Sequence, residues 1–324
     1  MTTNDPLVSI IINCFNGEKY LPEAIKSVLD QTYKNWEVIF WDNQSTDKSS
    51  EIFKSYKDGR LKYFYAKEHT SLGEARNLAI EKSKGDFVSF LDTDDFWHKE
   101  KLSLQMNHFN NSEVGVVFSN FWFIKKDIKK KKLCSHKKLP RGNIYNELIK
   151  NYNIGILTTI IRKKFYLKLK KKFDTRYTIL EDFDLFIRLS KLCVFESVQT
   201  PLAFYRLHGK NLLTQSKGKE IEETETWLGE NQFHLSQFDI KQIINISEDR
   251  YFLEDFDEAL FKALYPPSDD LIKSVFNNMN GSRLTERIRE RIFKLINSIS
   301  LEQALEKVRL KEGEDSKSGI VTMP

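Results

Sequence analysis

The first hundred residues alternate between apolar runs of strand length and segments with helical periodicity, and this alternation restricts the fold more than any other feature. Nearly continuous apolar runs predict buried strands, and apolar residues at helical spacing predict the helices between them. The predicted strands cover residues 8–14, 36–41, 61–66 and 87–91, and the predicted helices cover residues 21–29, 48–57 and 73–82. Such a βαβαβαβ series predicts a mainly parallel sheet covered by helices on both faces, with ligands bound beyond the carboxyl ends of the strands.

The rhythm changes after residue 98. The pattern there predicts a helix, two strands, a buried helix and two short strands, at residues 99–109, 114–124, 156–161, 180–192, 195–198 and 202–207. From about residue 216 amphipathic helices dominate, at residues 220–233, 250–264, 271–276, 284–296 and 301–308. The chain is therefore predicted to have an α/β domain over residues 1–215, a helical region over 216–312 and a flexible tail at 313–324.

Composition excludes several classes of protein. Hydrophobic residues make up 40% of the chain and aromatic residues 13%, which is enough apolar surface to exclude disorder as the main state. No apolar run approaches the roughly 18 residues of a membrane span, and the N-terminal residues lack the pattern of a signal peptide. Three distant cysteines without metal-ligand spacing fit reduced thiols. We therefore expect a cytoplasmic protein.

Basic residues are concentrated in two blocks, residues 125–141 and 162–176. Together the blocks hold seventeen Lys and Arg against two Asp, so their local charge is +15, whereas the chain as a whole carries +5. Such blocks suit anionic partners, namely nucleic acid, phospholipid head groups or phosphorylated substrates. A merely solvated, lysine-rich surface is the alternative interpretation.

Three carboxylates stand within four positions at the end of the fourth predicted strand: Asp92, Asp94 and Asp95. Carboxylates so close together repel one another unless a cation lies among them. Hard oxygen ligands suit Mg²⁺ or Mn²⁺, and such an ion in turn suits a diphosphate ligand. The alternative is that these acids only cap the following helix.

Four motifs in a fixed order carry a resemblance to a known family. VSIIINCFNGEKYLPEAIKSVLDQTYKNWEVIFWDNQSTDKSSEI and GEARNLAIEKSKGDFVSFLDTDDFW are followed by ILEDFDLFIRLS and FYRLHGKN. The set resembles family 2 glycosyltransferases over residues 7–212. The resemblance implies a GT-A fold, with a nucleotide-binding half at 7–98, an acceptor half at 99–215 and a C-terminal helical extension.

The resemblance also implies a donor site. The loop after the first strand would hold the nucleobase and ribose through Asn13, Cys14, Phe15 and Asn16. Asp42 and Asn43 match a paired-Asp segment whose second member reads uracil, and Arg76 matches an arginine that lies over the nucleotide and its phosphates. Asn43 departs from the family's Asp. Its carbonyl still accepts the uracil N–H but its amide adds donors, so UDP is favoured and other bases stay open.

Metal and catalytic roles follow from the same resemblance. Asp92, Asp94 and Asp95 match the metal and ribose acids of the DxD motif, with Asp95 the first choice as a direct ligand of Mn²⁺ or Mg²⁺. His208 is a candidate ligand of the metal or the leaving diphosphate, although a lone histidine is more often structural. Asp182 matches the general base and Glu181 supports it or binds the acceptor. Asp184 is the rival base, and capping of the helix is the alternative for all three acids.

The implied reaction is a single displacement at the anomeric carbon, which inverts its configuration. The chain has no QxxRW element, so transfer of one sugar to a glycan or lipid-linked acceptor is favoured, as in the synthesis of surface polysaccharide, lipopolysaccharide or glycoprotein glycans. The basic blocks would hold the enzyme peripherally at the inner face of the cell membrane. A nucleic-acid or anionic-lipid binding protein with a degenerate transferase fold is the alternative. It leaves the acidic motifs without a purpose, so no nucleic acid is expected. A nucleotidyltransferase is also less favoured, because no Gly- and Arg-rich phosphate loop lies near the N-terminus.

Overall fold

A computed structural model describes residues 5–125, 131–208, 211 and 219–231 of the chain. The chain divides into two compact units, residues 1–223 and 224–324. This division lies eight residues beyond the predicted boundary at 215. The predicted helices after residue 231 and the predicted tail lie outside the described residues.

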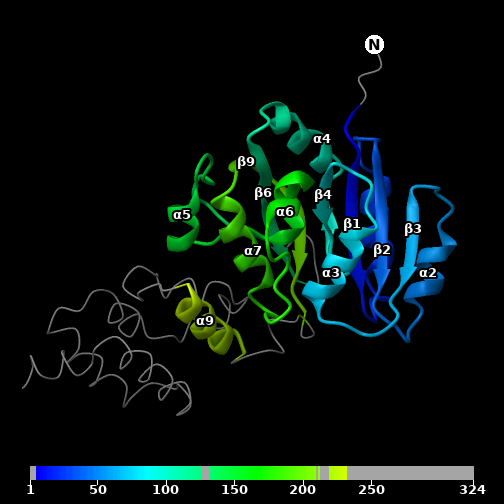
Figure 1. Cartoon of the computed structure of the whole chain (residues 1–324). Coiled ribbons are helices and arrows are strands. Elements are labelled where there is room, and N and C mark those ends of the chain that lie inside the picture. Colours follow the sequence, from blue (N-terminus) through cyan, green and yellow to red (C-terminus); the bar gives the residue numbers. More distant parts are fainter. Residues whose placement is uncertain (1–4, 126–130, 209–210, 212–218, 232–324) are drawn as a thin grey trace, which may run out of the picture. The chain divides into compact units, whose positions relative to one another are not determined.

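One mixed sheet forms the centre of the first unit (Figure 1). Its described strands are β1 (Val8–Cys14), β2 (Trp36–Asp42), β3 (Leu61–Tyr65), β4 (Phe87–Phe90), β5 (Phe96–Trp97), β6 (Val114–Ile124), β7 (Lys131–Leu133), β8 (Ile160–Arg162) and β9 (Val194–Arg206). They lie in the order β3-β2-β1-β4-β8-β6-β9-β5, with β7 paired to β6. The first four strands in this order are parallel, as predicted, and antiparallel pairs occur only in the second half.

Helices cover the sheet. They are α1 (Leu21–Leu29), α2 (Ser49–Ser55), α3 (Leu72–Glu81), α4 (Lys101–Met106), α5 (Tyr145–Lys150), α6 (Lys163–Lys168), α7 (Glu181–Ser190) and α9 (Lys219–Glu230), with 3-10 turns at Asn107–Asn110 and Ile156–Thr158. Pro22 stands in the first turn of α1, where its missing N–H costs nothing. Ser71 caps α3 by accepting the Glu74 N–H. Within the described residues, no helix is both long and apolar enough to cross a membrane.

The register of the parallel strands brings their carboxyl ends together. β1 pairs with β2 from Val8 opposite Trp36 to Cys14 opposite Asp42, and both strands are buried on both faces almost throughout. Burial on both faces explains why their sequences are nearly continuous apolar runs. Because β4 lies on the other side of β1, its acidic turn follows at the same edge of the sheet.

Two predictions in the second half were wrong in detail. A single long strand, β9, replaces the two short strands predicted around Pro201. The ladder between β6 and β9 shifts register beside Asn120, which pairs with Pro201, so the proline sits at an irregularity where no ladder N–H is needed. The strand predicted at 156–161 begins as a 3-10 turn and becomes β8 only at Ile160. Helices α5 and α6 were not predicted.

Candidate active site

The loop after β1 lies against the turns that follow β2 and β4. Asn16, with a positive φ of 56°, accepts the Thr46 N–H at 2.8 Å through Oδ1. Gly17 donates its N–H to Ser49 Oγ at 2.9 Å. A Cβ on Gly17 would lie 2.7 Å from the Thr93 hydroxyl, so glycine allows this loop to approach the acidic turn. The carboxyl ends of β1, β2 and β4 therefore form one continuous surface.

Three of the four predicted donor residues in this loop, Phe15, Cys14 and Asn13, lie in different environments. The Phe15 side chain is 54% exposed and its ring packs against His69, with centroids 4.5 Å apart. An exposed ring at this edge is available for stacking on a ligand. Cys14 is buried, and this burial raises the pKa of its thiol, so it is a poor nucleophile. The Nδ2 atom of Asn13 is buried without a hydrogen-bond partner.

Asp42 and Asn43 fix the loops at this edge. The Asp42 carboxylate accepts the Ser45 N–H at 2.7 Å and the Tyr63 hydroxyl at 2.6 Å. Asn43 is 6% exposed; it donates to the Thr70 carbonyl at 2.8 Å and accepts the Thr70 N–H at 3.2 Å. A carboxylate could not donate to that carbonyl, which gives a physical reason for Asn in place of the family's Asp. The reading of a base by Asn43 stays a prediction.

Arg76 joins the donor half of the fold to the helix that carries the predicted base. It projects from α3 and its side chain is 3% exposed. Nη1 donates to Glu181 Oε1 at 2.7 Å, and Nη2 donates to Asp92 Oδ1 at 3.2 Å. The structure thus brings together three predicted site residues that are up to 105 positions apart in the chain.

Desolvation changes the pKa values of the three acids near Arg76. Desolvation raises the pKa of Asp92, Glu181 and Asp182, while the Arg76 charge opposes the rise in all three. The pKa of Arg76 is itself raised by Asp92, Glu181 and Asp182 against its own desolvation. Glu181 Oε2 is buried without a hydrogen-bond partner, which is consistent with a proton on this carboxyl. Neighbouring carboxyls with raised pKa values are typical of sites that transfer protons.

Asp182 stands in the first turn of α7, and its carboxylate accepts the Phe183 N–H at 2.6 Å. The buried Tyr152 hydroxyl lies beside it and lowers the pKa of Asp182, while the Asp182 charge raises the pKa of Tyr152. The Tyr152 ring packs edge-to-face on Phe183 with centroids 5.1 Å apart. Sequence reasoning missed Tyr152, because it stands in a segment without any motif and meets Asp182 only through the fold.

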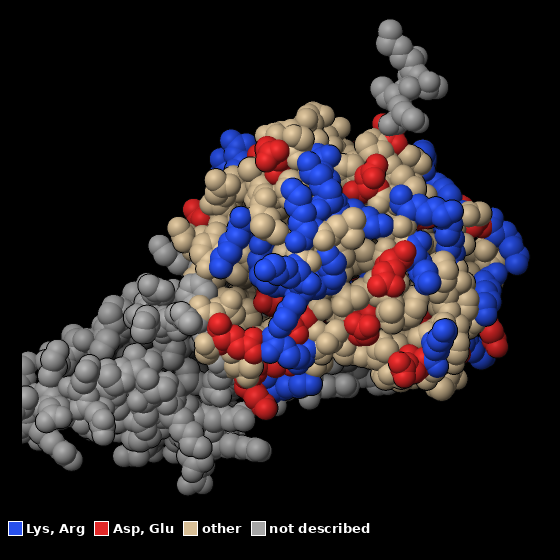
Figure 2. All heavy atoms as spheres, viewed as in Figure 1, with Lys and Arg blue, Asp and Glu red and all other residues tan. Residues whose placement is uncertain are grey.

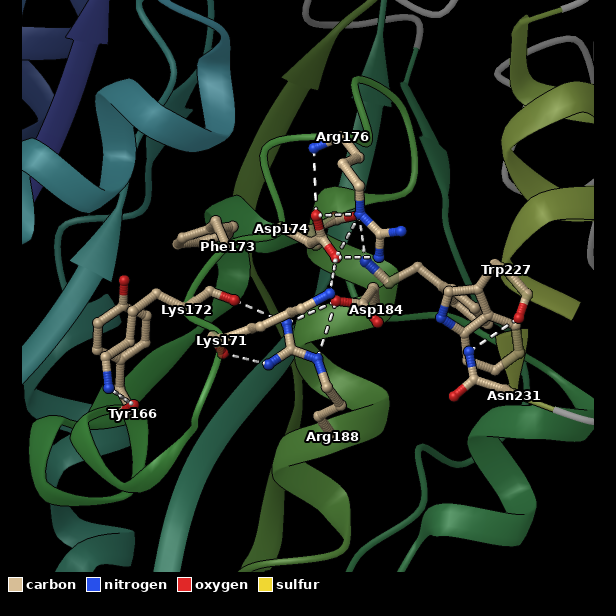
Figure 3. A network of polar contacts seen from close by, with 12 residues as sticks. Tyr166, Lys171, Lys172, Phe173, Asp174, Arg176, Asp184, Arg188, Trp227 and Asn231 are labelled. Carbon is tan, nitrogen blue, oxygen red and sulfur yellow. Dashed lines mark hydrogen bonds and ion pairs between the residues drawn. The ribbon is translucent and has the colours of Figure 1, made fainter. Parts of the chain in front are cut away.

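The carboxylate of Asp184, the rival candidate for the base, forms an ion pair with Arg188. Its carboxylate receives two hydrogen bonds from Arg188, at 2.9 and 2.5 Å, one turn further along α7 (Figure 3). Arg188 also donates to the carbonyls of Lys171 and Lys172, which ties the preceding loop to the helix. Asp184 is therefore held in an ion pair within α7, and Asp182 remains the predicted base.

Asp94 and His208 meet at the end of the site, with Asp94 Oδ2 and His208 Nε2 2.9 Å apart. The ring of His208 stacks on Tyr20, with centroids 5.5 Å apart. Arg206 holds the acidic turn, because its backbone N–H donates to Asp95 Oδ1 at 2.8 Å and its Nε donates to the Asp94 carbonyl at 2.9 Å. Asp95 is buried, whereas Asp94 and His208 are partly exposed.

Asp94 and His208 have the chemistry of ligands for a divalent ion. A carboxylate and an imidazole in contact at a partly exposed position fit Mn²⁺, and Asp94 and His208 supply that pair. Within the described residues, no three His, Cys, Asp or Glu side chains are already gathered as a complete metal site. The ligand predicted first, Asp95, is tied to β9, so its direct binding to metal stays a prediction.

Comparisons with known proteins show the family of the chain. The family model for glycosyl transferase family 2 matches residues 9–169. A UDP-Glc:alpha-D-GlcNAc-diphosphoundecaprenol beta-1,3-glucosyltransferase of Escherichia coli, WfaP, is 32% identical over 216 residues, which are 66% of this chain and 82% of that protein. The chain belongs to glycosyltransferase family 2. The predicted family is thereby confirmed.

Other members of glycosyltransferase family 2 are similar over different lengths. The putative teichuronic acid biosynthesis glycosyltransferase TuaG of Bacillus subtilis is 34% identical over 166 residues, 51% of this chain and 65% of that protein. That match therefore spans just under two thirds of the relative's length. A second E. coli glucosyltransferase with the same described activity, WfgD, is 29% identical over 70% of this chain and 87% of its own.

Solved structures confirm the GT-A fold. S. aureus TarS 1-349 in complex with UDP-GlcNAc superimposes with a TM-score of 0.55 and 17% identity, over 83% of this chain and 81% of TarS. The mannosyltransferase PcManGT of Pyrobaculum calidifontis, in complex with GDP-Man and Mn²⁺, superimposes with a TM-score of 0.58 and 12% identity, over 97% and 88%. At these identities the likeness supports the fold alone.

Proposed function

We propose that the protein transfers a single sugar from a UDP-sugar to a hydroxyl group of a lipid-linked or polysaccharide acceptor, with inversion at the anomeric carbon. One observation carries the proposal. The Asp182 carboxylate, with a raised pKa, lies near the buried Arg76 and the partly exposed Asp92, at the edge of the sheet where the DxD turn ends. A base next to a diphosphate site is the arrangement that such a displacement requires.

In the proposed mechanism Asp182 takes the proton from the acceptor hydroxyl as its oxygen attacks the anomeric carbon. The bond to the nucleotide diphosphate breaks on the opposite side, so one displacement inverts the configuration. The raised pKa makes Asp182 a better proton acceptor than a solvated carboxylate, provided that it is ionised at the working pH. Arg76 favours the ionised state, and Glu181 offers its free Oε2 to the acceptor.

Asp94 and His208, with Asp95 behind them, are the residues that would hold Mn²⁺ or Mg²⁺. When bound, the ion neutralises negative charge on the leaving diphosphate. The chain's own contribution is to fix these side chains: Tyr20 stacks on the imidazole, and Arg206 holds the acidic turn in place. The exposed ring of Phe15 at the same edge is suited to stack on the base.

Relatives support the choice of donor and acceptor. Both E. coli relatives are described as glucosyltransferases that use UDP-Glc and a GlcNAc-diphosphoundecaprenol acceptor, and the TarS structure contains UDP-GlcNAc. The PcManGT structure contains GDP-Man, so the fold accommodates more than one base. We favour a UDP-linked donor and a lipid-diphosphate acceptor for this chain.

We further propose that the enzyme binds an anionic membrane surface, where lipid-linked acceptors are found. Basic side chains gather over α6 (Figure 2). Within the second basic block, Arg162, Lys163 and Lys172 donate to backbone carbonyls, and Arg176 pairs with Asp174. Lys164, Lys168, Lys170 and Lys171 are exposed around Leu167, which is 58% exposed, and Lys171 also lies 3.5 Å from the Asp174 carboxylate. Part of the first block, residues 126–130, lies outside the described residues.

A membrane test follows from this surface. Reversing Lys164, Lys168 and Lys170 to Glu should weaken binding to phosphatidylglycerol vesicles at least a hundredfold, because each lysine near an anionic surface contributes about 1 kcal/mol. The matched control reverses three exposed lysines elsewhere: Lys57, Lys67 and Lys99. If both triple variants lose vesicle binding equally, net charge and not this surface determines the binding. If the first variant binds vesicles as the wild type does, this surface does not bind the membrane.

The transferase activity is tested with nucleotide-sugar panels. Unfolding of the purified chain is followed with Mn²⁺ and UDP, GDP or other nucleotides, since a ligand at a hundred times its Kd adds about 2.7 kcal/mol to stability. Transfer is then measured with UDP-Glc and a GlcNAc-diphospholipid. Asp182→Asn should lower kcat at least a hundredfold, whereas Asp184→Asn should keep transfer per folded molecule. The reverse pattern would reassign the base, and no turnover with any donor would refute the proposed activity.

A further inference from the structure

A carboxylate from the start of α9 closes the turn that precedes the catalytic helix. The Glu223 carboxylate accepts hydrogen bonds from three consecutive backbone N–H groups: Thr178 at 2.7 Å, Ile179 at 2.8 Å and Leu180 at 3.0 Å. Glu223 is 5% exposed, so these charge-assisted bonds are screened from water. The three donors lie 43 to 45 residues before Glu223 in the chain.

The contacts of Glu223 compensate for the missing side-chain cap at the start of α7. Its N-cap residue is Leu180, which has no side-chain oxygen and makes no side-chain cap. The first turn of α7 instead carries Glu181, Asp182 and Asp184, so three carboxyls crowd an end whose backbone donors need partners. Glu223 satisfies the N–H groups immediately before that turn. It therefore fixes the backbone from which Glu181 and Asp182 project.

We propose that Glu223 is a positioning residue for the base, acting through the backbone of residues 178–180. This inference rests on the proposed function and extends it, because it makes catalysis depend on a segment outside the predicted catalytic domain of 1–215. Glu223 does not reach the reacting atoms in this role. It sets the place of the Asp182 carboxylate, and a displacement of about 1 Å there is enough to lower the rate roughly a hundredfold.

The charge of Glu223 acts on the same cluster. The charged and titratable groups around Glu181 are Arg76 from α3, Asp92 after β4, Asp182 on α7, Tyr152 after α5 and Glu223 itself. Among them Arg76 lowers the pKa of Glu181, and Glu223 raises it. Removing the Glu223 charge should therefore lower the pKa of Glu181. A purely structural role would leave the pKa of Glu181 where it is.

The test compares Glu223→Gln with Glu222→Gln, which removes the same charge from an exposed neighbouring position. Gln keeps the size but has only one accepting atom, whereas the carboxylate uses Oε1 for Thr178 and Oε2 for Ile179 and Leu180. We expect Glu223→Gln to lower kcat roughly 10- to 100-fold with the KM for the donor within twofold, and to lower the pKa of Glu181 in a carboxyl NMR titration. Glu222→Gln should match the wild type in both.

A second measurement is independent of activity. Hydrogen exchange of the full chain should become at least tenfold faster at one or more of the amides of Thr178, Ile179 and Leu180 in Glu223→Gln, with the β1 amides unchanged. Unaltered kcat and an unaltered pKa of Glu181 would overturn the inference, as would a loss of activity explained by the unfolded fraction alone. If the wild-type chain transfers no sugar, the proposed function fails, while the exchange result still shows whether Glu223 holds the turn.

Discussion

Replacement of Arg76 by Met is the sharpest test of the buried ion pair between Arg76 and Glu181. Met keeps the length and apolar stem of the side chain but removes the only cation within hydrogen-bond distance of Glu181 among the described residues. The Arg76 and Glu181 side chains are 3% and 6% exposed, so the lost charge leaves a carboxylate that water does not reach. Breaking a buried pair by removing one partner costs about 3–5 kcal/mol.

The size of this loss depends on pH in a definite direction. Arg76 lowers the pKa of Glu181 and Asp182, so its removal raises both folded-state values further above those of the unfolded chain. Over the widened range the folded state holds more protons than the unfolded state. The free energy of unfolding of Arg76→Met should therefore fall as the pH rises, by up to about 1.4 kcal/mol per pH unit for each group.

The assay is urea unfolding at pH 5.5 and pH 8, followed by circular dichroism and extrapolated to water. Arg76→Met should lose several kcal/mol at pH 8 and clearly less at pH 5.5. The double variant Arg76→Met with Glu181→Gln should recover at least about 2 kcal/mol at pH 8, because the buried charge is gone as well. A single variant within about 1 kcal/mol of wild type at pH 8, or a double variant no more stable than the single one, would refute this account of the cluster.

Three further perturbations have definite directions. Lys101 is fully buried, has no carboxylate partner among the described residues and donates to Ser89 Oγ at 3.1 Å. Burial holds its pKa well below 10.5, so wild-type stability should rise with pH toward 10.5, and Lys101→Met should abolish that slope in urea titrations. Tyr152→Phe removes a hydroxyl that lowers the pKa of Asp182, so the acidic limb of kcat should move to higher pH with the thermal midpoint within a few degrees of wild type. Arg176 lowers the pKa of Asp174 to about 2; Arg176→Ala should cost about 1 kcal/mol at pH 7, and the difference should vanish between pH 4 and pH 2, where Asp174 becomes protonated.

The local pattern of apolar residues was sufficient to predict the elements of the first half of the fold. The strands from β1 to β4 and the helices between them lie within one or two residues of their predicted bounds, because burial on both faces leaves an unmistakable apolar run. The edge where Asp42, Asp92 and the loop after β1 meet followed from parallel topology alone. Pattern failed where a strand contained an irregularity, as at Pro201, and where short helices were rich in lysine, as in α6.

The partners of the site residues could not be predicted. Asn43 is bonded to Thr70, Asp184 is held by Arg188, and the turn before α7 is closed by Glu223. Periodicity says which face of a helix is buried, but it does not say which cation will neutralise an acid on that face. The spacing of Asp184 and Arg188, four residues apart on one helix, was the one such signal available in the sequence.

The Arg76 guanidinium already donates hydrogen bonds to two carboxylates, so its charge is partly neutralised within the chain. The family resemblance implies an arginine over the phosphates, yet its Nη1 and Nη2 donate to Glu181 and Asp92. One guanidinium faces three carboxyls, counting Asp182, so the cluster has no positive charge to spare when these acids are ionised. We therefore expect a bound metal ion to neutralise a diphosphate at this edge of the sheet, and contact of Arg76 with the nucleotide stays a prediction. Asp94 and His208 stand there, partly exposed and in contact, while Arg76 holds the base-bearing helix against the donor half.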